Sequence, residues 1–330
     1  MPRPPAPLDD KLGPVFRVGA ARAAGVTEGR LRAADLASPF RGVRQRAVSD
    51  AQPHAEGPYP MDEVARAAIL ERVRAHALLL PQHAFYIGCT ALAIQGLPLL
   101  DARAAQDADL EVAVFAPHRA LRRPGIRSLQ VQPGLAHTTT VEGIRVATPA
   151  TVWALLARDL SERDLVKMGD AMVRIPRDDR GIRRPELQLA TPAQLRAAIE
   201  AGGRRGAAKL RAALPRISPH SMSLLETDWR ENLRGTGLPE PELDVEVRDA
   251  RGILLGISDG AFPQYRLAVE IEGDHHRVTR QQWNRDIEKY AAYAAVDWEP
   301  VRLTSSHIRP DRGRDVAIVR AALLRRGWKP

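Results

Sequence analysis

The chain has 330 residues, of which 44% are hydrophobic and 27% are charged. This length is typical of two or three domains, and the composition excludes a disordered chain. No apolar run reaches the roughly 18 residues of a membrane-spanning helix, and the N-terminus lacks the apolar stretch of a secretory signal. Cys89 is the only cysteine, which excludes an internal disulfide and a cysteine-based zinc site. We therefore expect a soluble cytoplasmic protein, associated with the nucleoid and without a membrane partner.

Basic residues outnumber acidic ones by 49 to 40, which gives a net charge of +9. Residues 174–216 contain eleven basic and four acidic side chains, so most of the excess lies in one short stretch. Arginine supplies forked donors that suit phosphate, which favours a nucleic-acid contact there. A solvated linker whose arginines contact nothing explains the charge equally well.

The first part of the chain, residues 1–57, predicts two short helices followed by a β-hairpin. Small and apolar residues recur at helical spacing over 15–24, and Gly25 ends that helix. Thr27 is a good N-cap for a second helix over 28–36. This order favours a winged helix-turn-helix over a generic pair of helices. The candidate DNA contacts are Arg22, Arg30, Arg32 and Arg41 here, with Arg204 and Arg205 in the basic stretch.

The middle of the chain, residues 61–175, predicts a small α/β domain without a catalytic motif. Cys89 stands among small residues and is best explained as a buried structural thiol. Alternating acids at 107–111 indicate an exposed strand face rather than a metal cluster. The expected elements are a helix over 61–80, strands over 110–115, 128–131 and 144–146, and helices that begin at 150 and 162.

The last part, residues 220–330, gives the clearest pattern, with the order α-β-β-β-α-β-α. An amphipathic helix comes first, and two turns separate the three strands that follow. The expected ranges are a helix over 221–234, strands over 243–248, 253–259 and 266–271, a helix over 281–295, a strand over 300–304 and a helix over 316–326. Residues 176–219 would then be an arginine-rich linker or helix.

Three acidic side chains are predicted to meet on one β-ribbon. Asp259 and Glu270 are equally distant from the turn between their strands, so they should lie opposite each other. Glu272 shares the face of Glu270 because strand residues two apart point the same way. Close carboxylates are costly to ionise unless a cation neutralises them, and oxygen ligands suit Mg²⁺ or Mn²⁺. His276 follows in a flexible turn, where it could position a water or take its proton.

Such a site suits phosphodiester hydrolysis, in which a metal polarises the phosphate and activates a water. The alternative is an acidic sheet edge that makes surface ion pairs with nearby arginines. Each acid considered alone favours the acidic sheet edge, whereas the three acids together with His276 favour a metal-dependent site.

The segment from Asp259 to Arg277 resembles the Vsr-like (very-short-patch-repair-like) branch of the PD-(D/E)XK nucleases. The resemblance extends over residues 221–328 and implies a restriction-endonuclease-like αβββαβ(α) domain. It also implies that Asp259 and Glu270 are metal ligands, that Glu226 is an accessory acid and that His276 is the catalytic histidine.

The sequence departs from that family at His275, which replaces what is often an aromatic residue, and at two further places. Glu272 stands where the wider superfamily has lysine, and this branch usually has aspartate there. The next helix has Asp286 and Lys289 where the family often shows aspartate and arginine. None of these departures removes an implied metal ligand.

The front of the chain is similar to antitoxins of the AbiEi type, from type IV toxin–antitoxin systems. The matching stretches are 21–46, 90–98 and 144–173. The similarity implies a winged helix-turn-helix followed by a small α/β domain, with roles in transcriptional control and phage defence.

The leading hypothesis is a multidomain α/β protein that binds DNA and cuts it with a Mg²⁺- or Mn²⁺-dependent endonuclease domain, in DNA repair or phage defence. The alternative is a catalytically silent regulator or antitoxin that uses the nuclease fold for binding. An RNA-directed nuclease is a third reading, disfavoured by the helix-turn-helix. We expect DNA as the partner and no small-molecule cofactor. The sequence leaves open whether the protein forms a homodimer.

Overall fold

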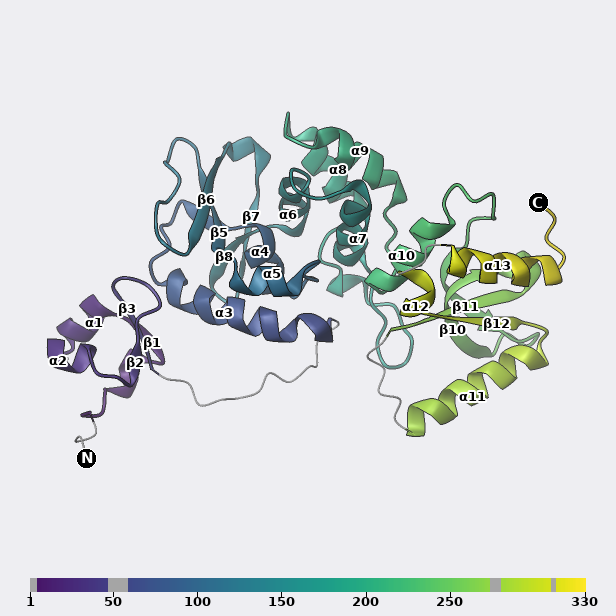
Figure 1. The fold of residues 1–330 in the computed structure, drawn as a ribbon, viewed down its shortest axis with the longest axis horizontal. Helices are drawn as coiled ribbons and strands as arrows, with labels where there is room; N and C mark the ends of the chain where they lie inside the picture. Colours follow the sequence, from purple (N-terminus) through teal and green to yellow (C-terminus); the bar gives the residue numbers. More distant parts are fainter. Residues whose placement is uncertain (1–4, 47–58, 274–279, 310–312) are drawn as a thin grey trace. The chain divides into compact units, whose positions relative to one another are not determined.

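The computed structural model describes residues 5–46, 59–273, 280–309 and 313–330. The chain divides into two compact units, Met1–Leu156 and Ala157–Pro330. Within the described residues it is a mixed α/β protein with three β-sheets (Figure 1). None of the helices in these ranges combines the length and the hydropathy of a membrane span.

The first unit begins with a small three-stranded sheet and two short helices. Thr27 caps the second helix, since its hydroxyl accepts a hydrogen bond from the backbone N–H of Arg30 at 3.3 Å. Ala21 is fully buried beneath the turn, and Gly25 ends the first helix at φ +85°. The elements are β1 (Val15–Arg17), α1 (Val18–Ala23), α2 (Glu28–Leu31), β2 (Leu36–Ala37) and β3 (Val43–Arg46).

The helices expected over 15–24 and 28–36 are both shorter than the sequence predicts, since α1 begins at Val18 and α2 ends at Leu31. Residues 15–17 form β1 instead, which pairs antiparallel with β3 in the sheet order β1-β3-β2. The reason is tertiary, because Phe16 is buried against Ala21 and Leu31 in the core of this module. The hairpin of β2 and β3 lies where the wing was predicted.

The rest of the first unit is built on a five-stranded sheet in the order β6-β5-β4-β8-β7. The predicted strand over 110–115 is confirmed, and those near 128 and 144 are also present. The elements are α3 (Glu63–Ala77), β4 (Ala84–Tyr86), α4 (Gly88–Ile94), α5 (Ala102–Asp107), β5 (Leu110–Phe115), β6 (Ile126–Val131), β7 (Thr138–Val141), β8 (Ile144–Ala147) and α6 (Pro149–Leu156). Glu111 does not face open solvent, because its carboxylate pairs with Arg127. Cys89 is half-buried rather than buried.

The second unit carries three helices and then the predicted α-β-β-β-α-β-α order. The helices are α7 (Glu162–Val173), α8 (Pro192–Glu200) and α9 (Ala207–Ala213). The remaining elements are α10 (Leu224–Leu233), β9 (Glu242–Arg248), β10 (Leu254–Phe262), β11 (Leu267–Glu272), α11 (Arg280–Ala295), β12 (Glu299–Thr304), α12 (Ser305–Ile308) and α13 (Arg314–Arg325). All the elements predicted after residue 220 are therefore present, and α12 is an addition.

The four-stranded sheet of the second unit has the order β12-β11-β10-β9, with β11 and β12 parallel. Its two faces are covered by different helices (Figure 1). Trp229 of α10 packs with Leu267, Val269 and Val319 on one face. Tyr293 of α11 packs with Ala268 on the other face.

Helix α7 packs against α10, although the sequence assigned it to the middle domain that ends at 175. Asp228 is buried and pairs with Arg163 at 3.0 Å and with Lys167 at 2.8 Å. Two residues later, Arg230 pairs with the buried Asp170 at 2.6 Å. These ion pairs join α7 to α10, and the division between the two units lies before α7, at Leu156.

We expect Gly260→Ala to destabilise the second unit. A Cβ at Gly260 would lie 2.5 Å from the ring of Trp229, which is fully buried, so the helix or the strand would have to move. The expected loss in free energy of unfolding is about 1–3 kcal/mol, measured by urea denaturation followed by circular dichroism. Gly203→Ala is the control, since its Cβ would meet nothing within 4 Å. Equal stabilities of the two variants would contradict the close packing.

Candidate functional site

The candidate site is centred on the pairing of β10 with β11. Gly260 pairs with Val269 in an antiparallel register, and continuing this register places Asp259 opposite Glu270. The side chain of Asp259 accepts a hydrogen bond from the backbone N–H of Ile271 at 2.6 Å. The two acids that the sequence predicted to be opposite therefore occupy neighbouring strand positions.

Glu270 is only 7% exposed, and one of its oxygens is paired while the other is not. Lys289 of α11 donates to Oε2 at 2.7 Å and also to the carbonyl of Ile257 at 2.7 Å. Oε1 is buried and has no hydrogen-bond partner within the described residues. A side-chain hydrogen bond from Ser258 lowers the pKa of Glu270, but the single proton of this hydroxyl is also within reach of the carbonyls of Gly260 at 2.8 Å and Val269 at 3.1 Å.

These surroundings raise the pKa of Glu270 to about 7. Burial is the largest cause, because it disfavours the charged form. The Lys289 ammonium opposes this rise, and the charge of Asp259 adds to it. Glu270 is thus a carboxyl group that can gain or lose its proton near neutral pH, and carboxyl groups of this kind concentrate at functional sites.

Glu226 shares the electrostatic environment of Asp259. It lies in the first turn of α10, is 5% exposed and accepts a hydrogen bond from the backbone N–H of Met222 at 2.7 Å. Burial, followed by the charge of Asp259, raises its pKa well above the usual range. The charge of Asp259 therefore raises the pKa of one acid on α10 and of another on β11.

Glu272 does not join this pair. Its carboxylate accepts a hydrogen bond from Arg302 of β12 at 2.5 Å, and Arg302 stacks on the ring of Tyr290. The parallel strand β12 supplies a cation beside Glu272, which is a neighbour that local sequence spacing does not reveal. No group of three or more His, Cys, Asp or Glu side chains is arranged to hold a metal ion in the described part of the chain. His276 lies outside the described residues.

Asp244 of β9 is a further acid that sequence reasoning missed. It is 4% exposed, and continuing the β9–β10 register places it opposite Asp259. Arg177 and Arg183 pair with it at 2.7 and 2.8 Å. Its charge also contributes to the raised pKa of Glu226. An aspartate inside a strand is the only signal that the sequence offered.

The predicted DNA contacts of the front module fall into two groups. Arg30 is committed to the protein, since it binds Asp35 at 2.7 Å and the carbonyl of Ala6 at 2.5 Å. Arg22 pairs with Glu28 at 2.5 Å but stays largely exposed. Arg32 and Arg41 are exposed on the surface. Their exposure to solvent therefore favours Arg32 and Arg41 as phosphate contacts.

The basic stretch is likewise partly used inside the protein. Arg204 is half-buried, which lowers its pKa, whereas Arg205 is exposed. Arg177, Arg183 and Arg216 pair with acids of the second unit. The exposed arginines of this stretch include Arg180, Arg196, Arg205 and Arg211. Some of the excess charge therefore holds the fold, and the rest faces solvent.

We expect Lys289→Met to destabilise the protein more at pH 8 than at pH 5. Without the ammonium, the pKa of Glu270 rises further, so the folded state must either bury an unpaired charge or bind a proton at pH 8. At pH 5 this carboxyl already carries its proton in the folded state, and the loss is smaller. The expected loss at pH 8 is about 3 kcal/mol, measured by chemical denaturation.

The double variant Lys289→Met/Glu270→Gln is the control for that measurement. It should recover much of the stability at pH 8, because no buried charge is left unpaired. A loss that is the same at both pH values, or that the double variant does not reduce, would contradict the pairing.

Comparison with known proteins gives distant similarity. The chain is 26% identical over 247 residues to two uncharacterized proteins of Mycobacterium tuberculosis, MT2308 of strain CDC 1551 and Rv2248 of strain H37Rv. Each match covers 74% of this chain and 83% of the relative. No protein-family model matches, and neither does a solved structure.

Proposed function

We propose that the protein binds DNA and hydrolyses its phosphodiester bonds with a divalent metal ion, Mg²⁺ or Mn²⁺. The observation that carries this proposal is the pair Asp259 and Glu270 on adjacent strands, with one buried carboxylate oxygen left without a partner. The order α-β-β-β-α-β-α around the pair supports it, since this is the order expected of a restriction-endonuclease-like domain.

The donor set fits a magnesium-type ion. Mg²⁺ is commonly bound by one or two carboxylates together with water and substrate phosphate, and Asp259 and Glu270 would supply those carboxylates. Such an ion polarises the phosphate and lowers the pKa of a bound water. It would also satisfy the orphaned Oε1 of Glu270.

The chain's own residues would perform the remaining tasks. Lys289 holds Glu270 in place, and its ammonium would stabilise negative charge that develops on a phosphate beside it. Burial and the charge of Asp259 raise the pKa of Glu226, which would favour hydrogen-bond donation by this carboxyl group. His276 remains our candidate for positioning the attacking water or taking its proton.

DNA would be held by the front module and by the exposed part of the basic stretch. Arg32 and Arg41 lie on the surface of the helix-turn-helix-like module, and Arg205 is exposed in the second unit. Phosphate contacts of this kind give affinity without sequence preference. A role in DNA repair or phage defence follows from the two family resemblances.

A catalytically silent DNA-binding regulator is the second candidate. It is favoured by Glu272, which pairs with Arg302 instead of joining Asp259 and Glu270. With two acids in place of three, the β-ribbon could serve as a binding surface alone.

Plasmid cleavage separates the two candidates. We expect the wild-type protein to cut supercoiled plasmid DNA when Mg²⁺ or Mn²⁺ is added, and the Asp259→Asn/Glu270→Gln variant to lose that activity. The isosteric changes remove the charges that would hold the ion while keeping side-chain volume. Binding of labelled DNA by both proteins, weakened by salt, is the control that the variant is folded. Salt-sensitive binding without cutting by the wild type would favour the regulator, and an RNA substrate tests the preference for DNA.

Metal binding should also stabilise the protein in a pH-dependent way. The folded pKa of Glu270 is about 7 against a usual 4.5, so this group lowers stability as the pH rises through that interval. The ion needs the ionised form, so Mn²⁺ should raise the melting temperature at pH 8 and much less at pH 5. At a metal concentration 100 times Kd, the gain is about 2.7 kcal/mol.

The matched variants for that experiment are on neighbouring elements. Glu270→Gln should abolish the response to Mn²⁺, whereas Glu288→Gln, an exposed acid of α11, should retain it. A response that is equal in both variants would count against Glu270 as a ligand.

A further inference from the structure

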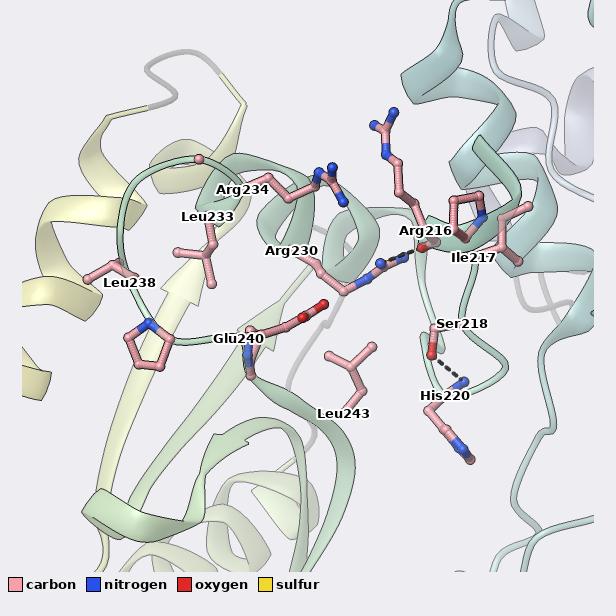
Figure 2. A pocket seen from close by; sticks show the side chains of 14 residues that line it. Arg216, Ile217, Ser218, His220, Arg230, Leu233, Arg234, Leu238, Glu240 and Leu243 are labelled. Atoms are coloured by element: carbon pink, nitrogen blue, oxygen red, sulfur yellow. Dashed lines mark hydrogen bonds between the residues drawn. The ribbon is translucent and has the colours of Figure 1, made fainter. Parts of the chain in front are cut away.

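A cavity of about 500 Å³ lies beside the C-terminal half of α10 (Figure 2). The segment 215–220, the last turns of α10 and the loop that leads into β9 enclose it. One part of its wall is apolar. The side chains there are Pro215, Leu233, Leu238, Pro239, Pro241 and Leu243. The other part carries nitrogen donors, so the cavity is suited to a ligand with an apolar body and a polar end.

The guanidinium groups of Arg216, Arg230 and Arg234 lie on the same side of this cavity (Figure 2). Arg230 is fixed by the buried Asp170 at 2.6 Å and by the carbonyl of Arg216 at 2.5 Å. Arg216 is fixed by Glu231. Two of the three guanidinium groups are thus positioned before any ligand binds, which lowers the entropy lost on binding.

The three cations lie close enough to oppose one another. The pKa of Arg216 is lowered, first by burial and then by the charge of Arg234, with a further contribution from Arg230. A guanidinium stays protonated in proteins, and the carboxylates of Glu231 and Glu162 beside Arg216 and of Asp170 beside Arg230 offset part of this repulsion. Arg234 keeps 55% of its side chain exposed and lies 4.0 Å from Glu231, which leaves it able to turn toward a ligand.

Two buried nitrogens at this cavity lack partners within the described residues. They are Nε of Arg230, a residue that is 8% exposed, and Nδ1 of His220. Nε of Arg230 is a donor, which is costly to bury without a partner, and an oxygen-rich ligand would supply the missing acceptor. Nδ1 of His220 donates or accepts according to its tautomer.

We propose that this cavity binds a nucleotide monophosphate group, with its phosphate on the three guanidinium groups. The sugar and base would lie against the leucines and prolines, because the cavity is larger than a phosphate ion requires. Glu240 stands on another part of the wall, where its carboxylate would repel additional phosphates and favour the monophosphate. The group can come from a free mononucleotide or from the phosphorylated end of a strand.

The cavity lies next to the candidate site without being part of it. Arg230 follows Glu226 by four residues on α10, so the two side chains are neighbours on one helix face. Leu243 of the cavity likewise precedes Asp244 of β9. Nucleotide binding here does not require the metal-dependent cleavage proposed above.

Isothermal titration calorimetry of the full chain without divalent metal tests the inference. We expect saturable binding of a deoxynucleoside 5′-monophosphate, weaker binding of the triphosphate and none of the nucleoside. Arg234→Ala should weaken binding about tenfold or more, since it removes a charge-assisted contact. Arg251→Ala, an exposed arginine at the β9–β10 turn, should bind as the wild type does. A second arm compares short strands that carry a 5′-phosphate or a 5′-hydroxyl.

A preference for the phosphorylated strand, lost in Arg234→Ala, with no binding of the free nucleotide would assign the strand end as the source. No binding in either arm, or binding that Arg234→Ala leaves unchanged, would overturn the inference. The Asp259→Asn variant keeps this test apart from the proposed function. It should bind the nucleotide as the wild type does while losing cleavage. If that variant binds the nucleotide but the wild type never cuts DNA, the nucleotide-binding inference is supported and the proposed nuclease activity is rejected.

Discussion

Gly260 pairs with Val269 across β10 and β11, and this register fixes the direction of the side chains beside it. Asp259 and Glu270 come next in the same register, on a ribbon buried between two helical layers. Burial then acts on Glu270, which is 7% exposed, because water screens its charge poorly, whereas Asp259 is half-buried. The ammonium of Lys289, delivered by the helix on one face, is the counter-charge that allows Glu270 to be buried there. The candidate chemistry depends on this one arrangement of strand and helix.

Helix α10 connects the separate features of the second unit. Trp229 fills the space above Gly260 and holds the helix on the sheet. Glu226 faces the environment of Asp259 at one end of the helix. Asp228 and Arg230 bind α7, and Arg230 also lines the nucleotide-sized cavity. A single ten-residue helix thus serves the core, the acidic pair, the neighbouring helix and the cavity.

The excess of arginine is used in two ways. Several guanidinium groups of the basic stretch bind buried acids, as Arg177 and Arg183 do at Asp244. A buried acid tolerates ionisation only with such partners, so Arg177 and Arg183 stabilise the fold through Asp244. Others, such as Arg205, remain on the surface. Net charge alone could not separate the two groups, because both look alike in the sequence.

The sequence alone determined the elements after residue 220 and the opposition of Asp259 to Glu270. Hydrophobic residues recur at a regular spacing in those elements, and clear turn residues separate them. In a hairpin, residues at equal distances from the turn lie opposite each other. The sequence did not predict short buried strands such as β4, because three consecutive buried residues show no hydrophobic periodicity. Only the tertiary structure decided which charges meet. Lys289 and Arg302 come to Glu270 and Glu272 from α11 and β12, 19 and 30 residues further along the chain. The ion pairs that join α7 to α10 are also tertiary contacts. Contacts of this kind depend on packing in three dimensions, which local spacing does not encode.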